Sequence, residues 1–81
     1  MAKTLGRAIF DLRRELGLNQ TEFGMQVGVT AMSVSRWEAD SNCPPGECTI
    51  AIAKLAKDPE SFWYFLSQIG LTKKDIHPHT T

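Results

Sequence analysis

The sequence predicts an all-α domain of five helices, and three observations support this prediction. Apolar residues recur at helical spacing in separate stretches across residues 5–69. Most of these stretches begin behind a polar residue that can cap a helix; these residues are Thr4, Asn19, Thr30 and Asp58. The first two stretches end at Gly17 and Gly28, where a helix needs a residue that tolerates a left-handed conformation.

The first helix is expected over residues 5–16, between the Thr4 cap and Gly17. Its apolar stripe should face the core and consists of Leu5, Ile9, Leu12 and Leu16. Three arginines lie on its other faces, and each of them taken alone is expected to be solvated; they are Arg7, Arg13 and Arg14.

The second helix is expected over residues 20–27, after a strong start signal. Asn19 and Glu22 stand three residues apart, as in a capping box, and Leu18 and Phe23 bracket them as a hydrophobic staple. Gln20 is the first residue of this helix, where free backbone N–H groups favour a phosphate oxygen.

A third helix is expected over residues 31–39, directly after the turn at Gly28 and the cap at Thr30. A helical wheel places Val34 and Trp37 on an inner, bulky side. The outer side carries one long cation among small or flexible side chains; its members are Met32, Ser35, Arg36 and Ala39. Two helices joined by so short a turn form a helix-turn-helix, and this outer face suits close approach to a grooved surface.

The stretch over residues 18–38, LNQTEFGMQVGVTAMSVSRWE, resembles the Cro/C1-type helix-turn-helix family, the lambda-repressor-like DNA-binding domains of phage repressors and many small bacterial regulators. The likeness extends over residues 5–69. It implies a five-helix fold that binds double-stranded DNA in the major groove and dimerises through the region of the fifth helix. It also implies an ion pair between Arg13 and Glu38 and a phosphate contact by Gln20.

The third helix departs from well-known phage repressors, because Ala31 and Met32 stand where those often have glutamines. Neither side chain can form paired hydrogen bonds, but both can touch a thymine methyl group, whereas Arg36 suits guanine. The predicted base contacts are Ala31, Met32, Ser35 and Arg36, and the predicted phosphate contacts are Gln20, Thr30, Ser33 and Asn42. Two alternatives stay open: Ser33 and Ser35 can exchange these roles, and Met32 can simply be an exposed residue.

Residues 40–46 are predicted to be non-helical because two prolines and a glycine interrupt them. The fourth helix then follows with an apolar stripe of Cys48, Ala51, Ile52, Leu55 and Ala56. Four potential zinc ligands exist in the chain, namely Cys43, Cys48, His77 and His79. The thiol spacing is not the usual C-x2-C, so no metal and no other cofactor is predicted, and Cys48 is expected in the core.

The fifth helix should begin with the Asp58 cap and Pro59 and end before Gly70. Its core-facing stripe consists of Phe62, Phe65, Leu66 and Ile69. Trp63 and Tyr64 lie beside that stripe, and we expect them in a symmetric homodimer interface. The alternative is that both rings pack on a short tail, residues 71–81, that follows a DNA-binding domain of residues 1–70.

The composition has nine basic and nine acidic residues, a balance that is unusual for a nucleic-acid binder. It predicts modest non-specific affinity and leaves more of the binding to local contacts. No apolar run long enough for a membrane span and no signal peptide are found, so a cytoplasmic protein without membrane contact is expected. No glycine-rich phosphate loop or nucleophile constellation suggests an enzyme.

Two functions fit this pattern. The first is a transcriptional regulator, a repressor that binds a palindromic operator as a homodimer. The second is an antitoxin-type interaction module that binds a partner protein through the fifth helix and can also bind DNA. They differ in whether a second copy or another protein covers Trp63.

Overall fold

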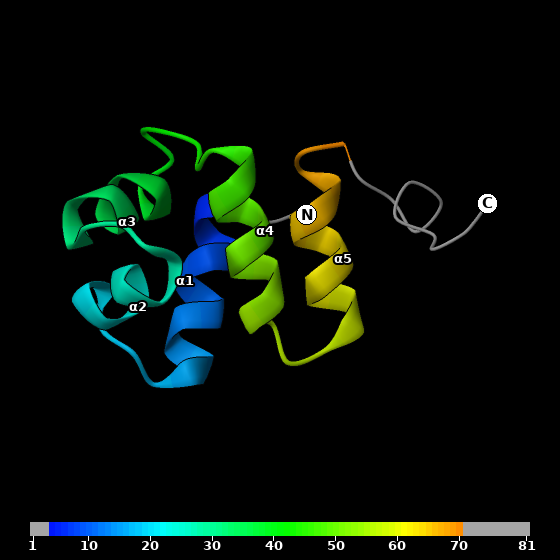
Figure 1. Cartoon of the computed structure of the whole chain (residues 1–81), viewed down its shortest axis with the longest axis horizontal. Helices are drawn as coiled ribbons and strands as arrows, with labels where there is room; N and C mark the ends of the chain where they lie inside the picture. Colours follow the sequence, from blue (N-terminus) through cyan, green and yellow to red (C-terminus); the bar gives the residue numbers. More distant parts are fainter. Residues whose placement is uncertain (1–3, 71–81) are drawn as a thin grey trace.

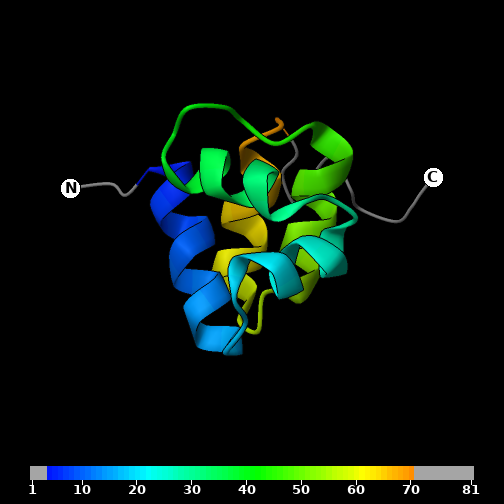
Figure 2. The ribbon, with the colours of Figure 1, turned by 90° about the vertical axis from the view of Figure 1, so that its left-hand side faces the viewer.

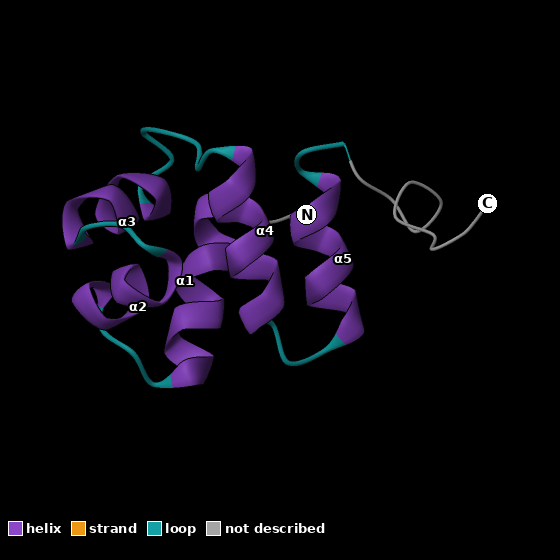
Figure 3. Ribbon diagram, viewed as in Figure 1, coloured by secondary structure: helices purple, strands orange, loops and turns teal. Residues whose placement is uncertain are grey.

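The computed structural model describes residues 4–70, and within that range it contains five helices and no strand (Figures 1 and 3). The helices are α1 (Leu5–Leu16), α2 (Gln20–Val27), α3 (Ala31–Glu38), α4 (Gly46–Leu55) and α5 (Pro59–Ser67). The all-α, five-helix prediction is therefore confirmed. The predicted tail, residues 71–81, lies outside the described residues. None of the helices within residues 4–70 is long and apolar enough to cross a membrane.

The helices form two groups around α1. On one side α2 and α3 pack together, and on the other α4 packs against α5 (Figure 1). Seen from the side of α2 and α3, α1 runs along one edge of the molecule and α4 along the other (Figure 2). This arrangement leaves one face of α3 free of the other helices.

The helix ends follow the local signals in the sequence. All four predicted N-caps accept a hydrogen bond from the backbone N–H three residues later; they are Thr4, Asn19, Thr30 and Asp58. The capping box is complete, because the Glu22 N–H donates to Asn19 Oδ1 at 2.7 Å and the Asn19 N–H donates to Glu22 Oε1 at 2.9 Å. Gly17 and Gly28 take left-handed conformations, with φ of 72° and 83°.

Four predicted boundaries are off by one or two residues. The fifth helix ends at Ser67, two residues before Ile69, and the fourth ends at Leu55, with Ala56 as its C-cap. The third helix ends at Glu38, and Ala39 is its C-cap. Gly46, which the sequence predicts to be non-helical, is the first residue of α4, because Pro45 has the extended backbone of an N-cap residue and the helix starts directly behind it.

The core is built from one face of each helix. Its fully buried side chains come from all five helices and include Ile9, Phe23, Val34, Ile52 and Phe65. The predicted stripe of α4 was partly wrong: Thr49 and Ala53 are buried, whereas Ala51, Leu55 and Ala56 are only half-buried. Contacts with both α2 and α5 cover a broad face of α4. The Thr49 hydroxyl donates to the Pro45 carbonyl oxygen at 3.1 Å, so it is satisfied despite its burial.

Two helices approach the neighbouring backbone through glycine. A Cβ atom at Gly24 in α2 would lie 2.5 Å from the carbonyl oxygen of Val29. A Cβ atom at Gly6 in α1 would lie 2.5 Å from the carbonyl oxygen of Trp37, at the end of α3. Only glycine allows these distances, and both glycines therefore fix where α3 lies.

Replacing Gly24 with alanine is expected to destabilise the domain. Alanine improves helix propensity by about 1 kcal/mol. The added Cβ atom, however, must displace the Val29 carbonyl, and overpacking of this kind usually costs about 1–3 kcal/mol of unfolding free energy. Urea unfolding of Gly24→Ala should give a net loss of unfolding free energy.

Gly46→Ala is the matched control, because a Cβ atom there would meet only Ile69 Cγ2 at 4.0 Å. This variant should be as stable as the wild type or slightly more stable. If Gly24→Ala were stabilised as much as Gly46→Ala, the close approach of α2 to the turn before α3 would be wrong.

Candidate nucleic-acid interface

Helix α3 has one buried and one exposed side. Val34 and Trp37 are 0% and 4% exposed and pack into the core. Met32 is 61% exposed, and Ser35 and Arg36 are also exposed. Since Val34 and Trp37 are three residues apart on one face, they fix the rotation of the helix about its axis.

A short turn sets the angle between α2 and α3. Gly28 takes the left-handed conformation that ends α2, and the Val29 N–H donates to the Gly24 carbonyl at 2.8 Å. Thr30 then caps α3 by accepting from the Ser33 N–H at 3.3 Å. The two helices thereby lie together on the face shown in Figure 2.

The four candidate base-contacting residues all belong to α3. Three of them are exposed; they are Met32, Ser35 and Arg36. Ala31 is half-buried in the first turn. Together they form a surface with an apolar beginning and a cationic end.

The four candidate phosphate-contacting residues lie around the ends of α2 and α3. The hydroxyl groups of Thr30 and Ser33 are 3.4 Å apart and hydrogen-bonded, at the start of α3. Asn42 is exposed in the loop after α3, where its N–H donates to the Arg36 carbonyl at 3.4 Å. Gln20 is half-buried, and its Nε2 donates to Glu38 Oε1 at 3.1 Å. An amide nitrogen carries two hydrogens, so Gln20 keeps one donor for another acceptor.

A buried ion pair joins α1 to the end of α3. Arg13 Nε lies 2.6 Å from Glu38 Oε2, and Arg13 Nη2 donates to Glu38 Oε1 at 3.1 Å. The two side chains are only 12% and 9% exposed. Arg13 Nη1 also donates to the Leu18 carbonyl at 3.0 Å. With Gln20 on the same carboxylate, this network connects α1, the start of α2 and the end of α3.

Asp40 has a role that sequence reasoning missed. Its Oδ1 accepts a hydrogen bond from the Gly6 N–H at 3.0 Å and so caps the first turn of α1. Asp40 itself has a φ of 60°, which an aspartate tolerates better than most residues. The partners are 34 residues apart, so no local pattern reveals the contact.

The two cysteines have different environments. Cys48 is a buried core residue, as expected, and burial raises the pKa of its thiol, with a further contribution from the nearby Glu47 charge. Cys43 is exposed. Residues 4–70 contain no group of three or more histidine, cysteine or acidic side chains that could hold a metal. His77 and His79 lie outside the described residues.

Comparisons with known proteins agree with this geometry. Residues 10–46 match the model of the RsaL-like HTH domain. A crystal structure of the P22 c2 repressor protein in complex with synthetic operator 9T matches with a TM-score of 0.64 and 31% sequence identity. That match covers 67% of this chain and 82% of the repressor chain. No curated protein sequence matches.

The chain belongs to the lambda-repressor-like, Cro/C1-type helix-turn-helix family. It is thus a helix-turn-helix DNA-binding domain that resembles the DNA-binding domain of a phage repressor. The family and the fold are those of DNA-binding regulators rather than of enzymes.

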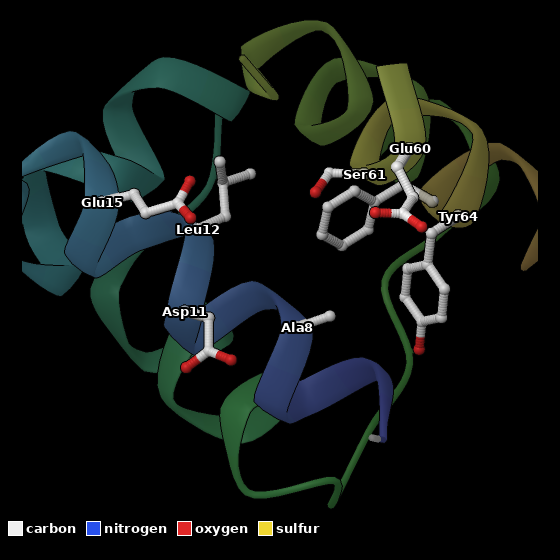
Figure 4. A pocket seen from close by; sticks show the side chains of 8 residues that line it. Ala8, Asp11, Leu12, Glu15, Glu60, Ser61 and Tyr64 are labelled. Atoms are coloured by element: carbon white, nitrogen blue, oxygen red, sulfur yellow. The ribbon is translucent and has the colours of Figure 1, made fainter. Parts of the chain in front are cut away.

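A groove of about 440 Å³ lies between α1 and α5 of this helix-turn-helix domain, and Leu12 and Phe65 are among the residues that line it. Acidic side chains from both helices surround it, namely Asp11, Glu15 and Glu60 (Figure 4). Tyr64 also lines this groove, whereas Trp63 does not. The acidic surroundings make the groove unsuitable for DNA.

Arg13→Ala is expected to destabilise the domain strongly, because it leaves the buried Glu38 carboxylate without its cation. Breaking a buried pair from one side typically costs about 3–5 kcal/mol. Denaturant unfolding measures the loss.

Arg7→Ala is the control for Arg13→Ala, since it breaks an exposed pair with Asp11, in which the Arg7 side chain is 65% exposed. The loss of unfolding free energy in Arg7→Ala should stay below about 0.5 kcal/mol. Equal losses in the two variants would contradict the anchoring role of Arg13.

The cysteines provide a second test of the core. A thiol reagent attacks the thiolate, so Cys48 should resist it through both its burial and its raised pKa. We expect rapid reaction at Cys43 only, and a Cys43→Ser variant that reacts only after denaturant is added. Rapid reaction of native Cys43→Ser would show that α4 is not packed as described.

Proposed function

We propose that this protein represses transcription by binding a palindromic operator in double-stranded DNA as a homodimer. The observation that carries the proposal is the exposed outer face of α3, on a helix whose inner face is buried. An α-helix fits the major groove of B-DNA, where its side chains reach the base edges. The similar P22 c2 repressor in complex with an operator supports this use of the helix.

The chemistry of α3 suggests what each side chain reads. The Arg36 guanidinium can donate two hydrogen bonds to guanine O6 and N7. Met32 and Ala31 offer apolar contact to thymine methyl groups at the other end of the helix. Ser35 lies between them and can bond to several bases. Specificity then depends mainly on one strong polar contact and one apolar contact in each half-site.

Contacts with DNA phosphates would fix the position of α3 relative to the base pairs. Gln20 lies at the N-terminus of α2, where the helix dipole and free N–H groups favour an anion. Its spare amide hydrogen can donate to a phosphate while Glu38 holds the other. Thr30, Ser33 and Asn42 complete the proposed set at the two ends of α3.

A dimer would place two copies of α3 on one side of the DNA, at half-sites about 10 base pairs apart or a multiple of that distance. Trp63 and Tyr64 are the proposed interface residues on α5. Both are half-buried, and Trp63 packs edge-on against Phe62 with 5.0 Å between ring centroids. Such amphipathic aromatic side chains are frequent anchors of interfaces.

A different protein could cover the same aromatic side chains, and the antitoxin-type function then remains a second candidate. It predicts a mixed complex with a co-purified partner, whereas the repressor proposal predicts a dimer of one chain. Sedimentation of the purified protein separates the two. Both proposals place the protein in the cytoplasm, with access to DNA. In both, residues 1–70 form the DNA-binding domain.

Selection of bound sequences from a random duplex pool tests the proposed function. The wild type should enrich a palindromic motif. Arg36→Ala should lose a guanine preference at one symmetric pair of positions, because a bidentate contact is worth about 1–3 kcal/mol of discrimination. Met32→Ala should weaken a thymine preference instead.

Met25→Ala is the matched control for Met32→Ala, since Met25 is also exposed, at 75%, but belongs to α2. It should select the wild-type motif. If the wild type enriches no motif at low salt, the repressor proposal is wrong. If Arg36→Ala and Met32→Ala select the wild-type motif unchanged, α3 does not read the bases.

A further inference from the structure

Three arginines gather around one aromatic ring on α1. The guanidinium carbons of Arg7, Arg13 and Arg14 lie 5.5, 5.3 and 5.5 Å from the centre of the Phe10 ring. They stand three or four residues from Phe10, so all four side chains share one side of the helix. Each guanidinium group is attracted to the face of the Phe10 ring. This attraction offsets part of the repulsion between the three positive charges.

The surrounding carboxylates only partly neutralise these charges. Arg13 is paired with Glu38, and Arg7 Nε lies 3.1 Å from Asp11 Oδ1. Arg14 is exposed and forms no ion pair within residues 4–70. Three guanidinium groups against these two carboxylates leave one positive charge. The exposed position of Arg7 and Arg14 makes this charge available to a partner.

The arginine cluster extends from the α3 side of α1 toward its acidic side. Arg13 reaches Glu38, so one edge of the cluster lies beside the end of α3. At the other edge Arg7 pairs with Asp11, which together with Glu15 lines the acidic groove toward α5 (Figure 4). The cluster thus adjoins α3 through Arg13, although the whole chain has no net charge.

We infer that Arg7, Phe10 and Arg14 form a phosphate-binding ridge, called here the α1 ridge, that contacts the DNA backbone beside the groove occupied by α3. This inference rests on the proposed function. Two phosphate backbones flank a major groove about 12 Å wide, so residues beside an inserted helix meet phosphates. As Figure 2 shows, α1 runs along one edge of the face that carries α2 and α3.

The chemistry of the ridge suits phosphate rather than bases. A guanidinium group donates two parallel hydrogen bonds to a phosphate, which is a strong and charge-assisted contact. The Phe10 ring restricts the arginine side chains before binding, and this lowers the entropy lost on binding. The ridge adds affinity for any duplex and carries no base preference of its own.

The test is the salt dependence of DNA binding by the full chain. Each phosphate contact contributes about 0.9 to the magnitude of the slope of log K against log salt concentration, so Arg7→Gln with Arg14→Gln should lower it by about two units for each bound protomer, or about four for the homodimer. The probes are a duplex with the selected motif and a scrambled duplex of equal length. Binding should weaken on both, with the motif unchanged. Replacing both arginines with lysine should retain most of the slope.

Lys54→Gln with Lys57→Gln is the control, because it removes two exposed charges from the end of α4 and the loop after it. It should leave the slope nearly unchanged. A thermal melt of each variant confirms that the core is intact. An additional Phe10→Leu variant should weaken binding at an unchanged number of charges.

The outcomes separate the ridge from the proposed function. If the double glutamine variant keeps the wild-type slope while the wild type selects a motif, the ridge is only a solvated surface and the inference is wrong. Equal losses in the ridge variant and the Lys54/Lys57 variant would also overturn it, since only net charge would then matter. If the wild type selects no motif, the proposed function is wrong. The salt dependence of binding to the scrambled duplex still tests the α1 ridge in that case.

Discussion

The buried pair of Arg13 and Glu38 is the interaction on which the rest of the structure depends. It connects α1 to the end of α3, and Gln20 and the Leu18 carbonyl extend it to the start of α2. A recognition helix of eight residues has too few backbone hydrogen bonds to be stable alone. The pair, together with buried Val34 and Trp37, therefore determines how the outer face of α3 is presented.

The structure explains how a chain without net charge can have a face suited to DNA. Three arginines gather around Phe10 on α1, and one of them, Arg13, reaches the end of α3, whereas acidic side chains line the groove toward α5. This uneven distribution of charge would orient the domain toward DNA, while the zero net charge gives little attraction at a distance. We therefore expect low non-specific affinity for DNA, which would give the proposed contacts of α3 more relative weight in choosing a site.

The sequence predicted the local features of the fold well, because caps and glycine ends depend on neighbouring residues. Asn19 with Glu22 and the turn at Gly28 are examples. Contacts between distant segments could not be predicted in this way. The Asp40 cap on Gly6, and the approach of the Val29 carbonyl to Gly24, depend on how α1 and α2 meet α3. The arginines around Phe10 stand at helical spacing in the sequence, but their shared contact with one ring depends on side-chain conformations that the spacing does not determine.

The central claim is that the outer face of α3 is the surface that meets DNA. Amide chemical shifts of the full chain, recorded as a selected duplex is added, test it most directly because they need no substitution. The account predicts the largest changes over residues 31–36, smaller ones at Gln20 and along the exposed side of α1, and little change in the groove at Ser61. Changes concentrated on α5 with none in α3 would contradict it.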